Sequence, residues 1–257
     1  MLLAVDCGNT NTVFAVFDDA GEMVGEWRTS TNANRTADEI GAWLVQIMAL
    51  DGIDRRGIDA AIIATVVPAT LFALRRMCRH FFGCEGLVVR ATDTDVGLEV
   101  LVDSPQELGA DRLVNAVAAR DAYGTPVMVV DFGTATTFDV LDDRGRYVGG
   151  AIAPGVNLSL EALHQASAQL PRVAIGRPDR TVATNTVQAM RSGIFWGYVG
   201  LVEGIVRRIK EEMSGSGMVV ATGGLAPLFT DSTPVIDLAE PNLTLRGLLL
   251  IHRRVNG

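Results

Sequence analysis

The sequence predicts an α/β protein made of two similar domains, and two internal repeats carry this prediction. The stretch Val127 to Thr137 is a near copy of Leu2 to Thr12. In each, an apolar run long enough for a buried strand ends in an aspartate, with a glycine two positions later and then small hydroxyl or amide side chains. A second pair of similar runs, Ile62 to Thr65 and Val219 to Thr222, occurs in the same order. We therefore expect one structural unit to occur twice.

The repeat extends beyond the first turn and predicts the same three strands in each half. After a one-residue slip the matches continue, with Val16, Asp18, Asp19, Gly21, Val24 and Gly25 matching Val140, Asp142, Asp143, Gly145, Val148 and Gly149. Each copy is typical of a β-meander, in which a tight turn and then an Asp-Asp-x-Gly turn join three strands. We predict domains at residues 1–118 and 119–257, with a ligand site in a cleft between them.

Length, composition and charge agree with a folded two-domain protein. The chain has 257 residues, of which 48% are hydrophobic and 20% charged, values typical of folded soluble proteins. Its formal net charge of -8 argues against non-specific binding to nucleic acid or to an anionic membrane. No apolar run approaches the length of a membrane span, and Met1 to Val5 is too short to be a signal peptide. We expect neither nucleic acid nor membrane as a partner.

The lysine content excludes several ways of binding phosphate. Lys210 is the only lysine, and it lies in an Arg-Arg-Ile-Lys-Glu-Glu run typical of the exposed end of a helix. P-loop ATPases, protein kinases and pyridoxal enzymes each need a lysine in a particular strand or loop. A phosphate bound by this chain must therefore depend on backbone N–H groups, hydroxyls, arginine or a metal ion.

The cysteines and histidines give little support for nucleophilic or zinc chemistry. Cys7, Cys78 and Cys84 are odd in number and have no Cys-x-x-Cys spacing, which favours reduced thiols in a cytoplasmic protein. We expect Cys7 to be a buried small residue rather than a nucleophile. The three histidines are scattered, so a Ser/His/Asp or Cys/His mechanism is not expected.

The first turn, Asp6 to Thr12, has the residues of an anion site. Its glycine, Gly8, lets the backbone come close to an oxyanion, and asparagine and threonine side chains can donate hydrogen bonds. Asp6 ends a strand and is suited to hold Mg²⁺ through water, because that ion keeps much of its hydration. A simple hairpin turn remains the alternative at this point.

A second candidate site follows Ser104, which we predict to cap a helix that has Pro105 in its first turn. Gly109 interrupts this pattern and predicts a second helix start with exposed N–H groups. There, Asp111 could accept a proton from a substrate hydroxyl and Arg112 could bind an anion. The alternative is a local Asp-Arg surface pair.

The remaining pattern predicts helices and one further ligand-binding turn. A cap at Thr36 starts one helix, a long helix runs from Thr184 to about Met213, and a helix from Leu243 to Val255 closes the second domain. Gly223 and Gly224 follow a strand and would let a flat base or ribose approach the backbone, which suits adenosine. An ordinary strand-to-helix turn would have the same residues.

These motifs together resemble type III pantothenate kinase, a family of the actin, hexokinase and Hsp70 superfamily. The resemblance runs almost from end to end, and it rests on the following stretches: Asp6 to Asn11, Gly109 to Arg112, Asp131 to Thr137, Gly150 to Gly155 and Ala221 to Pro227. Gly-Ala-Asp-Arg followed by Asp-Phe-Gly-Thr-Ala-Thr-Thr is specific to this family, whereas Asp-x-Gly alone would indicate only the superfamily. The resemblance implies a duplicated ribonuclease H-like, or actin-like ATPase, fold.

The resemblance also implies a reaction, in which the γ-phosphoryl of ATP moves to the primary hydroxyl of pantothenate in the first step towards coenzyme A. Asp111 would be the general base, and Asp131 would hold a monovalent cation, K⁺ or NH₄⁺. The implied pantothenate contacts are Gly109, Ala110, Asp111, Arg112 and Thr186. The implied ATP contacts are Asp6, Cys7, Gly8, Asn9, Thr10, Asn11, Thr12, Val13 and Thr134, to which the adenosine turn adds Gly223 and Gly224.

Members of the family are similar in forming homodimers, and we expect a homodimer here. One departure is visible, because Val102 stands where many members have a tyrosine near the acceptor pocket. Two other functions remain open from the residues. One is another kinase of the superfamily, such as a sugar or acetate kinase, and the other is a relative that has lost catalysis and acts as a regulatory protein.

Overall fold

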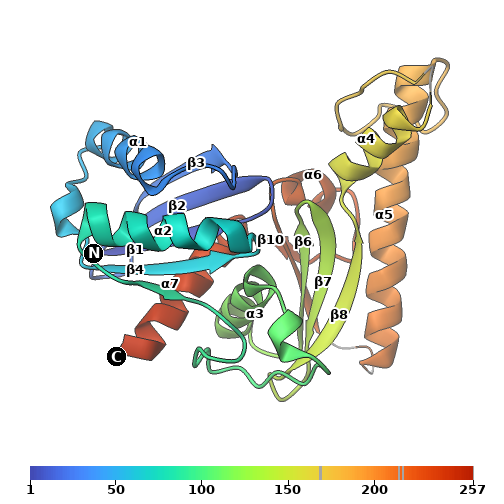
Figure 1. Ribbon diagram of the computed structural model, residues 1–257. Coiled ribbons are helices and arrows are strands. Elements are labelled where there is room, and N and C mark those ends of the chain that lie inside the picture. Colours follow the sequence, from blue (N-terminus) through green and yellow to red (C-terminus); the bar gives the residue numbers. More distant parts are fainter. Residues whose placement is uncertain (168–169, 214, 216, 257) are drawn as a thin grey trace. The chain divides into compact units, whose positions relative to one another are not determined.

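The computed structural model describes residues 1–167, 170–213, 215 and 217–256, and this part of the chain forms two compact units. The first unit contains Met1–Ala118 and the segment from Leu243 onward, and the second contains Ala119–Asn242. Each unit is built around one five-stranded mixed sheet (Figure 1).

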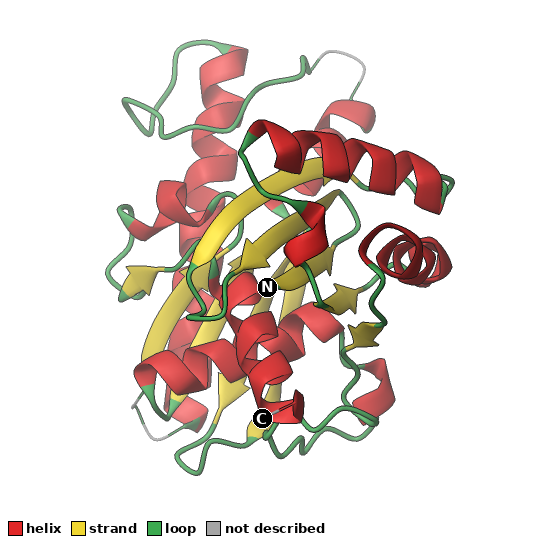
Figure 2. Ribbon diagram, turned by 90° about the vertical axis from the view of Figure 1, so that its left-hand side faces the viewer, coloured by secondary structure: helices red, strands yellow, loops and turns green. Residues whose placement is uncertain are grey.

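In the first unit the strand order is β3-β2-β1-β4-β5. Helices cover both faces of this sheet (Figure 2), with one apolar core on each face. The elements are β1 (Leu2–Cys7), β2 (Asn11–Phe17), β3 (Met23–Ser30), α1 (Ala37–Leu50), η1 (Arg55–Gly57), β4 (Ala60–Thr65), η2 (Pro68–Thr70), α2 (Leu71–Met77), the π-helical turn η3 (Cys78–Phe82), β5 (Gly86–Val88), η4 (Pro105–Glu107), α3 (Ala110–Tyr123) and α7 (Leu243–Asn256).

In the second unit the strand order is β8-β7-β6-β9-β10. Its main core contains three phenylalanines from β6, α5 and α6 whose rings stack, Phe132, Phe195 and Phe229. The elements are β6 (Val127–Phe132), β7 (Ala135–Leu141), β8 (Tyr147–Pro154), α4 (Val156–Gln165), α5 (Thr186–Glu212), β9 (Met218–Thr222), α6 (Ala226–Thr230) and β10 (Leu238–Ala239).

The two sheets have the same topology, which confirms the predicted duplication. In each, the first strand pairs antiparallel with the second and parallel with the fourth, so β1 and β6 occupy equivalent positions. The pairing of the second and third strands of each meander also shifts at the same place, because the third strand has one extra residue there. The register shifts between Val16 and Phe17 in one copy and between Val140 and Leu141 in the other, at positions that the sequence repeat aligns.

The helix starts agree with the sequence in part. Thr36 caps α1 with a full capping box, in which its hydroxyl accepts from the Glu39 N–H and the Glu39 carboxylate accepts from the Thr36 N–H. The prediction that Ser104 caps a helix is wrong, because Pro105–Glu107 forms only a 3₁₀ turn and the Ser104 side chain makes no capping bond. The regular helix α3 begins at Ala110, so the interruption predicted at Gly109 is present.

The terminal helix α7 differs from the sequence prediction. We expected it to close the second domain, but it packs on β1 and β4 of the first unit (Figure 1). Its apolar residues Leu245, Leu248 and Ile251 share a buried core with Leu113 and Val114 of α3. The amphipathic pattern of α7 predicted a helix correctly, but periodicity does not indicate which sheet an amphipathic helix covers.

A close contact between α7 and α3 yields a stability prediction. Alanine normally stabilises a helix by about 1 kcal/mol relative to glycine. At Gly247, however, an added Cβ would lie 2.3 Å from the Val114 carbonyl oxygen of α3. We expect Gly247→Ala to destabilise the protein by about 1–3 kcal/mol, as overpacking typically does, with a lower midpoint in thermal unfolding.

The control for this prediction is Gly200→Ala in α5, where an added Cβ would meet no other described atom within 4 Å. That variant should unfold at an unchanged or higher temperature. Equal behaviour of the two variants would show that α7 does not pack this closely on α3.

Candidate functional site

The first turn of the predicted ATP site joins β1 to β2 and presents part of its residues to solvent. The Gly8 N–H donates to the Asn11 carbonyl at 3.0 Å, which closes the turn. Exposed at its tip are the side chains of Asn9, Thr10 and Asn11. The other predicted ATP contacts behind them, Cys7, Thr12 and Val13, are buried. A ligand could therefore meet the side chains of the tip, whereas the buried side chains support the turn from inside.

A chain of hydroxyl groups holds this turn from behind. Thr31, which directly follows β3, donates from its hydroxyl to the Gly8 carbonyl at 2.7 Å and from its N–H to the Thr10 carbonyl at 2.9 Å. Its hydroxyl also lies 2.9 Å from that of Thr12. Because the carbonyls of Gly8 and Thr10 are bound from the protein side, the backbone of the turn is held in place before any ligand binds.

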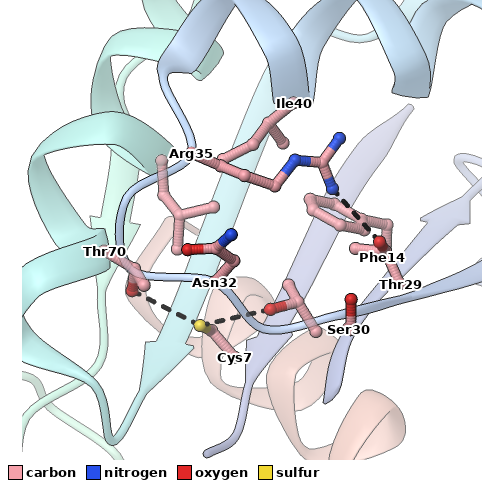
Figure 3. Close-up of a pocket in the computed structure, with 10 residues that line it drawn as sticks. Cys7, Phe14, Thr29, Ser30, Asn32, Arg35, Ile40 and Thr70 are labelled. Carbon is pink, nitrogen blue, oxygen red and sulfur yellow. Dashed lines mark hydrogen bonds between the residues drawn. The ribbon is translucent and has the colours of Figure 1, made fainter. Parts of the chain in front are cut away.

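The hydroxyl chain continues through the thiol of Cys7 to the next turn of the fold. Thr12 donates to the Cys7 Sγ at 3.3 Å, and the Thr70 hydroxyl lies 3.3 Å from the same sulfur (Figure 3). Thr70 in turn donates to the Val67 carbonyl at 2.8 Å. Cys7 is thus a buried packing residue, as predicted from its small size and position.

These groups line a small cavity between β2, β3, α1 and α2. Its volume is about 20 Å³, and the residues around it include Asn32 and Arg35 (Figure 3). A space of this size holds one water molecule. The cavity is therefore too small for a substrate and belongs to the support of the turn.

Asp111 lies in the first turn of α3, where the helix N-terminus favours a negative charge. Its Oδ1 accepts from the Arg112 N–H at 2.8 Å. A Cβ added at Gly109 would lie 2.5 Å from the same oxygen and 3.6 Å from Val66. A side chain at position 109 would therefore have to displace the Asp111 carboxylate, which lies against the backbone ahead of its own helix.

The Asp6 carboxyl group at the end of β1 lies within electrostatic reach of Asp111. Burial, together with the Asp111 carboxylate, raises the pKa of Asp6 to about 7, while the Arg28 guanidinium of β3 acts in the opposite direction. The first unit therefore brings two of the predicted site carboxylates together, and it adds an arginine that the sequence analysis did not select.

The second turn, between β6 and β7, is enclosed by glycines from distant parts of the second unit. A Cβ added at Gly223 would lie 2.5 Å from Asp131 Oδ1 and 2.8 Å from the Phe132 backbone, and Gly223 also has a φ of +88°. A Cβ added at Gly155 would lie 2.1 Å from the Thr134 carbonyl oxygen. The second unit therefore brings together Asp131, Thr134 and Gly223.

Two further predicted site residues lie at the starts of helices. Arg112 is partly buried in the first turn of α3, and Thr186 is exposed at the first position of α5. A Cβ added at Gly224 would meet no atom within 4 Å beyond its chain neighbours. Val102 is partly buried in the segment before η4.

Comparison with known proteins identifies the family of the chain. The family model for type III pantothenate kinase matches residues 2–208. The type III pantothenate kinase of Paramagnetospirillum magneticum is 61% identical over 254 residues, covering 99% of this chain and 97% of that protein. The enzyme of Rhodospirillum rubrum is likewise 61% identical, covering 99% and 98%.

The chain belongs to the type III pantothenate kinase family. Enzymes with this name phosphorylate pantothenate, using ATP, in coenzyme A biosynthesis. The family assignment confirms the resemblance seen in the motifs and makes this kinase a transferase. The two other functions left open by the residues, a sugar or acetate kinase and a non-catalytic relative, lose their support.

Solved structures show the same fold at low sequence identity. Component A of (R)-2-hydroxyglutaryl-CoA dehydratase from Acidaminococcus fermentans superposes with a TM-score of 0.55 and 11% identity, covering 99% of this chain and 96% of that one. The activator of 2-hydroxyisocaproyl-CoA dehydratase from Clostridium difficile gives 0.51 at 10% identity, covering 99% and 93%. These likenesses concern the fold alone, and they confirm the predicted actin-like α/β architecture.

The sequence analysis did not select two residues that matter for the first turn, namely Arg28 in β3 and Thr31 directly after it. Thr31 supports the first turn and Arg28 acts on Asp6, but both lie in a Trp-Arg-Thr-Ser-Thr stretch of ordinary strand composition. Only the pairing of β3 with β2 brings them near the turn. The available signal was the meander itself, which predicts that its third strand returns to the edge where the first strand ends.

The support of the first turn predicts an effect on nucleotide binding. Thr31→Val leaves the Gly8 carbonyl without its side-chain donor, which typically costs about 1–3 kcal/mol. We expect ATP to bind roughly tenfold more weakly, measured by calorimetric titration, since about 1.4 kcal/mol corresponds to a factor of ten.

Thr31→Ser keeps the hydroxyl and should bind ATP nearly as the wild type does. An unchanged ATP affinity in the valine variant, in a protein with native circular dichroism, would contradict the role of this hydroxyl.

Proposed function

We propose that the kinase transfers the γ-phosphoryl group of ATP to the primary hydroxyl of pantothenate with Asp111 as the general base, giving 4'-phosphopantothenate. The observation that carries this proposal is the position of the Asp111 carboxylate, which lies against Gly109 and within reach of Asp6. An uncharged alcohol must lose its proton as it attacks phosphorus, and a positioned carboxylate can accept that proton. Contacts of Gly109, Ala110 and Arg112 with pantothenate belong to the same proposal.

The phosphates of ATP would bind at the first turn. Exposed donors at its tip and a backbone fixed from behind by Thr31 support this assignment. Asp6 offers the kind of oxygen ligand that Mg²⁺ takes in addition to water and phosphate oxygens, so the residues fit this ion. When bound, Mg²⁺ would neutralise negative charge on the phosphates.

In the second unit, Asp131 would hold a monovalent cation, K⁺ or NH₄⁺, and Thr134 would contact ATP. The close packing of Gly223 and Gly155 around this turn supports a fixed carboxylate and a fixed carbonyl there. Gly223 and Gly224 would face adenosine, and Thr186 would contact pantothenate. The first phosphate turn and the acceptor motif would thus belong to residues 1–118, and the second turn and the adenosine motif to residues 119–242.

We further propose that the kinase is a cytoplasmic homodimer. Two apolar residues of the edge strand β8 and two of α4 are exposed, namely Val148, Ile152, Leu158 and Leu163. Exposed apolar residues on neighbouring elements are typical of a protein interface. All three cysteines are free, as expected in a reducing compartment. No helix in the described ranges is both long and apolar enough to cross a membrane.

The experiment that tests the function measures ATP-dependent phosphorylation of pantothenate by the purified protein with Mg²⁺. Asp111→Asn keeps the size of the side chain and removes the base, so turnover should fall by about 10²- to 10⁴-fold, the usual contribution of a positioned base. Replacing K⁺ or NH₄⁺ by Na⁺ should lower turnover of the wild type.

Asp121→Asn is the matched control, since it makes the same change at an exposed position of the same helix. It should leave the rate unchanged. An intact rate in Asp111→Asn would remove Asp111 from the role of base, and a folded wild type that binds ATP but phosphorylates no pantothenate would overturn the proposed reaction.

The proposed dimer has its own test. Ile152 is 65% exposed on β8, and Ile152→Glu would bury an unpaired charge if this face were covered by a second copy. We expect this variant to be monomeric in size-exclusion chromatography with light scattering, where the wild type is a dimer. Leu50→Glu, at an 85% exposed position at the end of α1, should remain dimeric. A dimeric Ile152→Glu would exclude this face as the interface.

A further inference from the structure

Arg28 of β3 lies in the same cross-strand row as Asp6. In the register of the first sheet, Asp6 is paired with Val13, and Val13 is paired with Arg28. Side chains that lie directly opposite each other on neighbouring strands point to the same face. Arg28 and Asp6 therefore lie on the same face of the sheet, the face that α3 covers. Their strands, β3 and β1, are separated by β2, and neighbouring strands are about 4.8 Å apart.

The Arg28 side chain is long enough to extend towards Asp6, because only Val13 lies between the two residues in this row. The side chain between the two strands is Val13, over which the aliphatic part of an arginine can lie. Its guanidinium acts on the Asp6 carboxyl group, lowering its pKa, which places the charge within electrostatic range of the end of β1.

The same guanidinium is open to a ligand. The Arg28 side chain is 54% exposed, and its ion pair with Glu26 is 4.0 Å long, the outer limit of such a contact. An exposed pair of this length contributes little free energy. A stronger acceptor, such as a phosphoryl oxygen, would therefore displace Glu26 at little cost.

Phosphoryl transfer at the first turn needs positive charge close to Asp6 and Asp111, which are both acids. The first unit offers no lysine for this purpose, because the only lysine of the chain, Lys210, belongs to the second unit. Arginine binds phosphoryl groups through two parallel N–H bonds, and its charge persists at every physiological pH.

We propose that Arg28 is a further catalytic residue, whose guanidinium donates hydrogen bonds to the γ-phosphoryl oxygens of ATP during transfer. This inference rests on the proposed binding of the ATP phosphates at the first turn. In the step, the pantothenate hydroxyl oxygen forms a bond to the γ-phosphorus, and the bond from that phosphorus to the bridging oxygen breaks. The hydroxyl proton passes to Asp111, and ADP leaves. Arg28 gains and loses no proton, and it stabilises the charge on the phosphoryl oxygens as they move.

The test compares Arg28→Ala and Arg28→Lys with the control Glu26→Gln, which removes the ion-pair partner and keeps the cation. We expect Arg28→Ala to lose about 10²- to 10³-fold in kcat, as loss of one donor to a developing charge typically does. Because ADP lacks the γ-phosphoryl group, its affinity should stay within about threefold, a difference below 1 kcal/mol. Arg28→Lys should recover only part of the rate, and Glu26→Gln should equal the wild type.

Chemical rescue separates a catalytic role from a structural one. Guanidinium ions at millimolar concentration should raise the turnover of Arg28→Ala, whereas the same concentration of NaCl should not. A wild-type rate in Arg28→Ala, or a loss that appears equally in Glu26→Gln, would overturn the inference. So would a loss confined to ADP affinity with kcat unchanged. The wild-type assay distinguishes this failure from that of the proposed function, because the latter would abolish pantothenate phosphorylation in the unaltered protein as well.

Discussion

Strand β1 is hydrogen-bonded on both sides, antiparallel to β2 and parallel to β4, and the polar groups of the first unit depend on this pairing. The antiparallel partner forces a tight turn directly after Cys7, and the parallel partner ends beside it at Thr65. The Val66 N–H donates back to the Cys7 carbonyl, so the two strand ends stay joined beyond the sheet. Because β1 is bonded on both sides, the backbone at Asp6 is held in place. The positions of the neighbouring acids and hydroxyls relative to Asp6 then follow from the strands and turns that carry them.

Glycines leave room for the predicted site residues of this kinase. At Gly109 the space of a side chain is taken by a carboxylate oxygen, and at Gly155 by a backbone carbonyl oxygen. Neither residue has a positive φ, so the requirement for glycine there is close approach alone. At Gly223 both reasons apply, because its φ is +88° and its missing side chain leaves room for Asp131. Glycines that resemble simple turn signals in the sequence therefore also make room for neighbouring groups, which are the carboxylates of Asp111 and Asp131 and the carbonyl of Thr134.

The sequence predicted what depends on local pattern or on the repeat. The β-meanders, the capped start of α1 and the break at Gly109 all have local signals, and the structure contains them. What it missed depends on contacts distant in the chain. Ser104 has good capping chemistry but is followed by a 3₁₀ turn. Thr31 and Arg28 gain their importance through the register of β3. The meander predicts that this strand returns to the same edge of the sheet, but it does not predict which residues of β3 pair with which residues of β2.

The position of α7 has a consequence for the order in which the chain folds during synthesis. The first unit needs Leu245, Leu248 and Ile251 to complete the core that faces α3, and these residues are made after the whole of the second unit. A ribosome therefore releases the second unit in full while the core between the first sheet and α3 still lacks the residues of α7. The core on the other face of the same sheet contains only residues up to Cys84, so it can form early in synthesis. The first unit would thus complete one of its cores early and the other only after its last helix has been made.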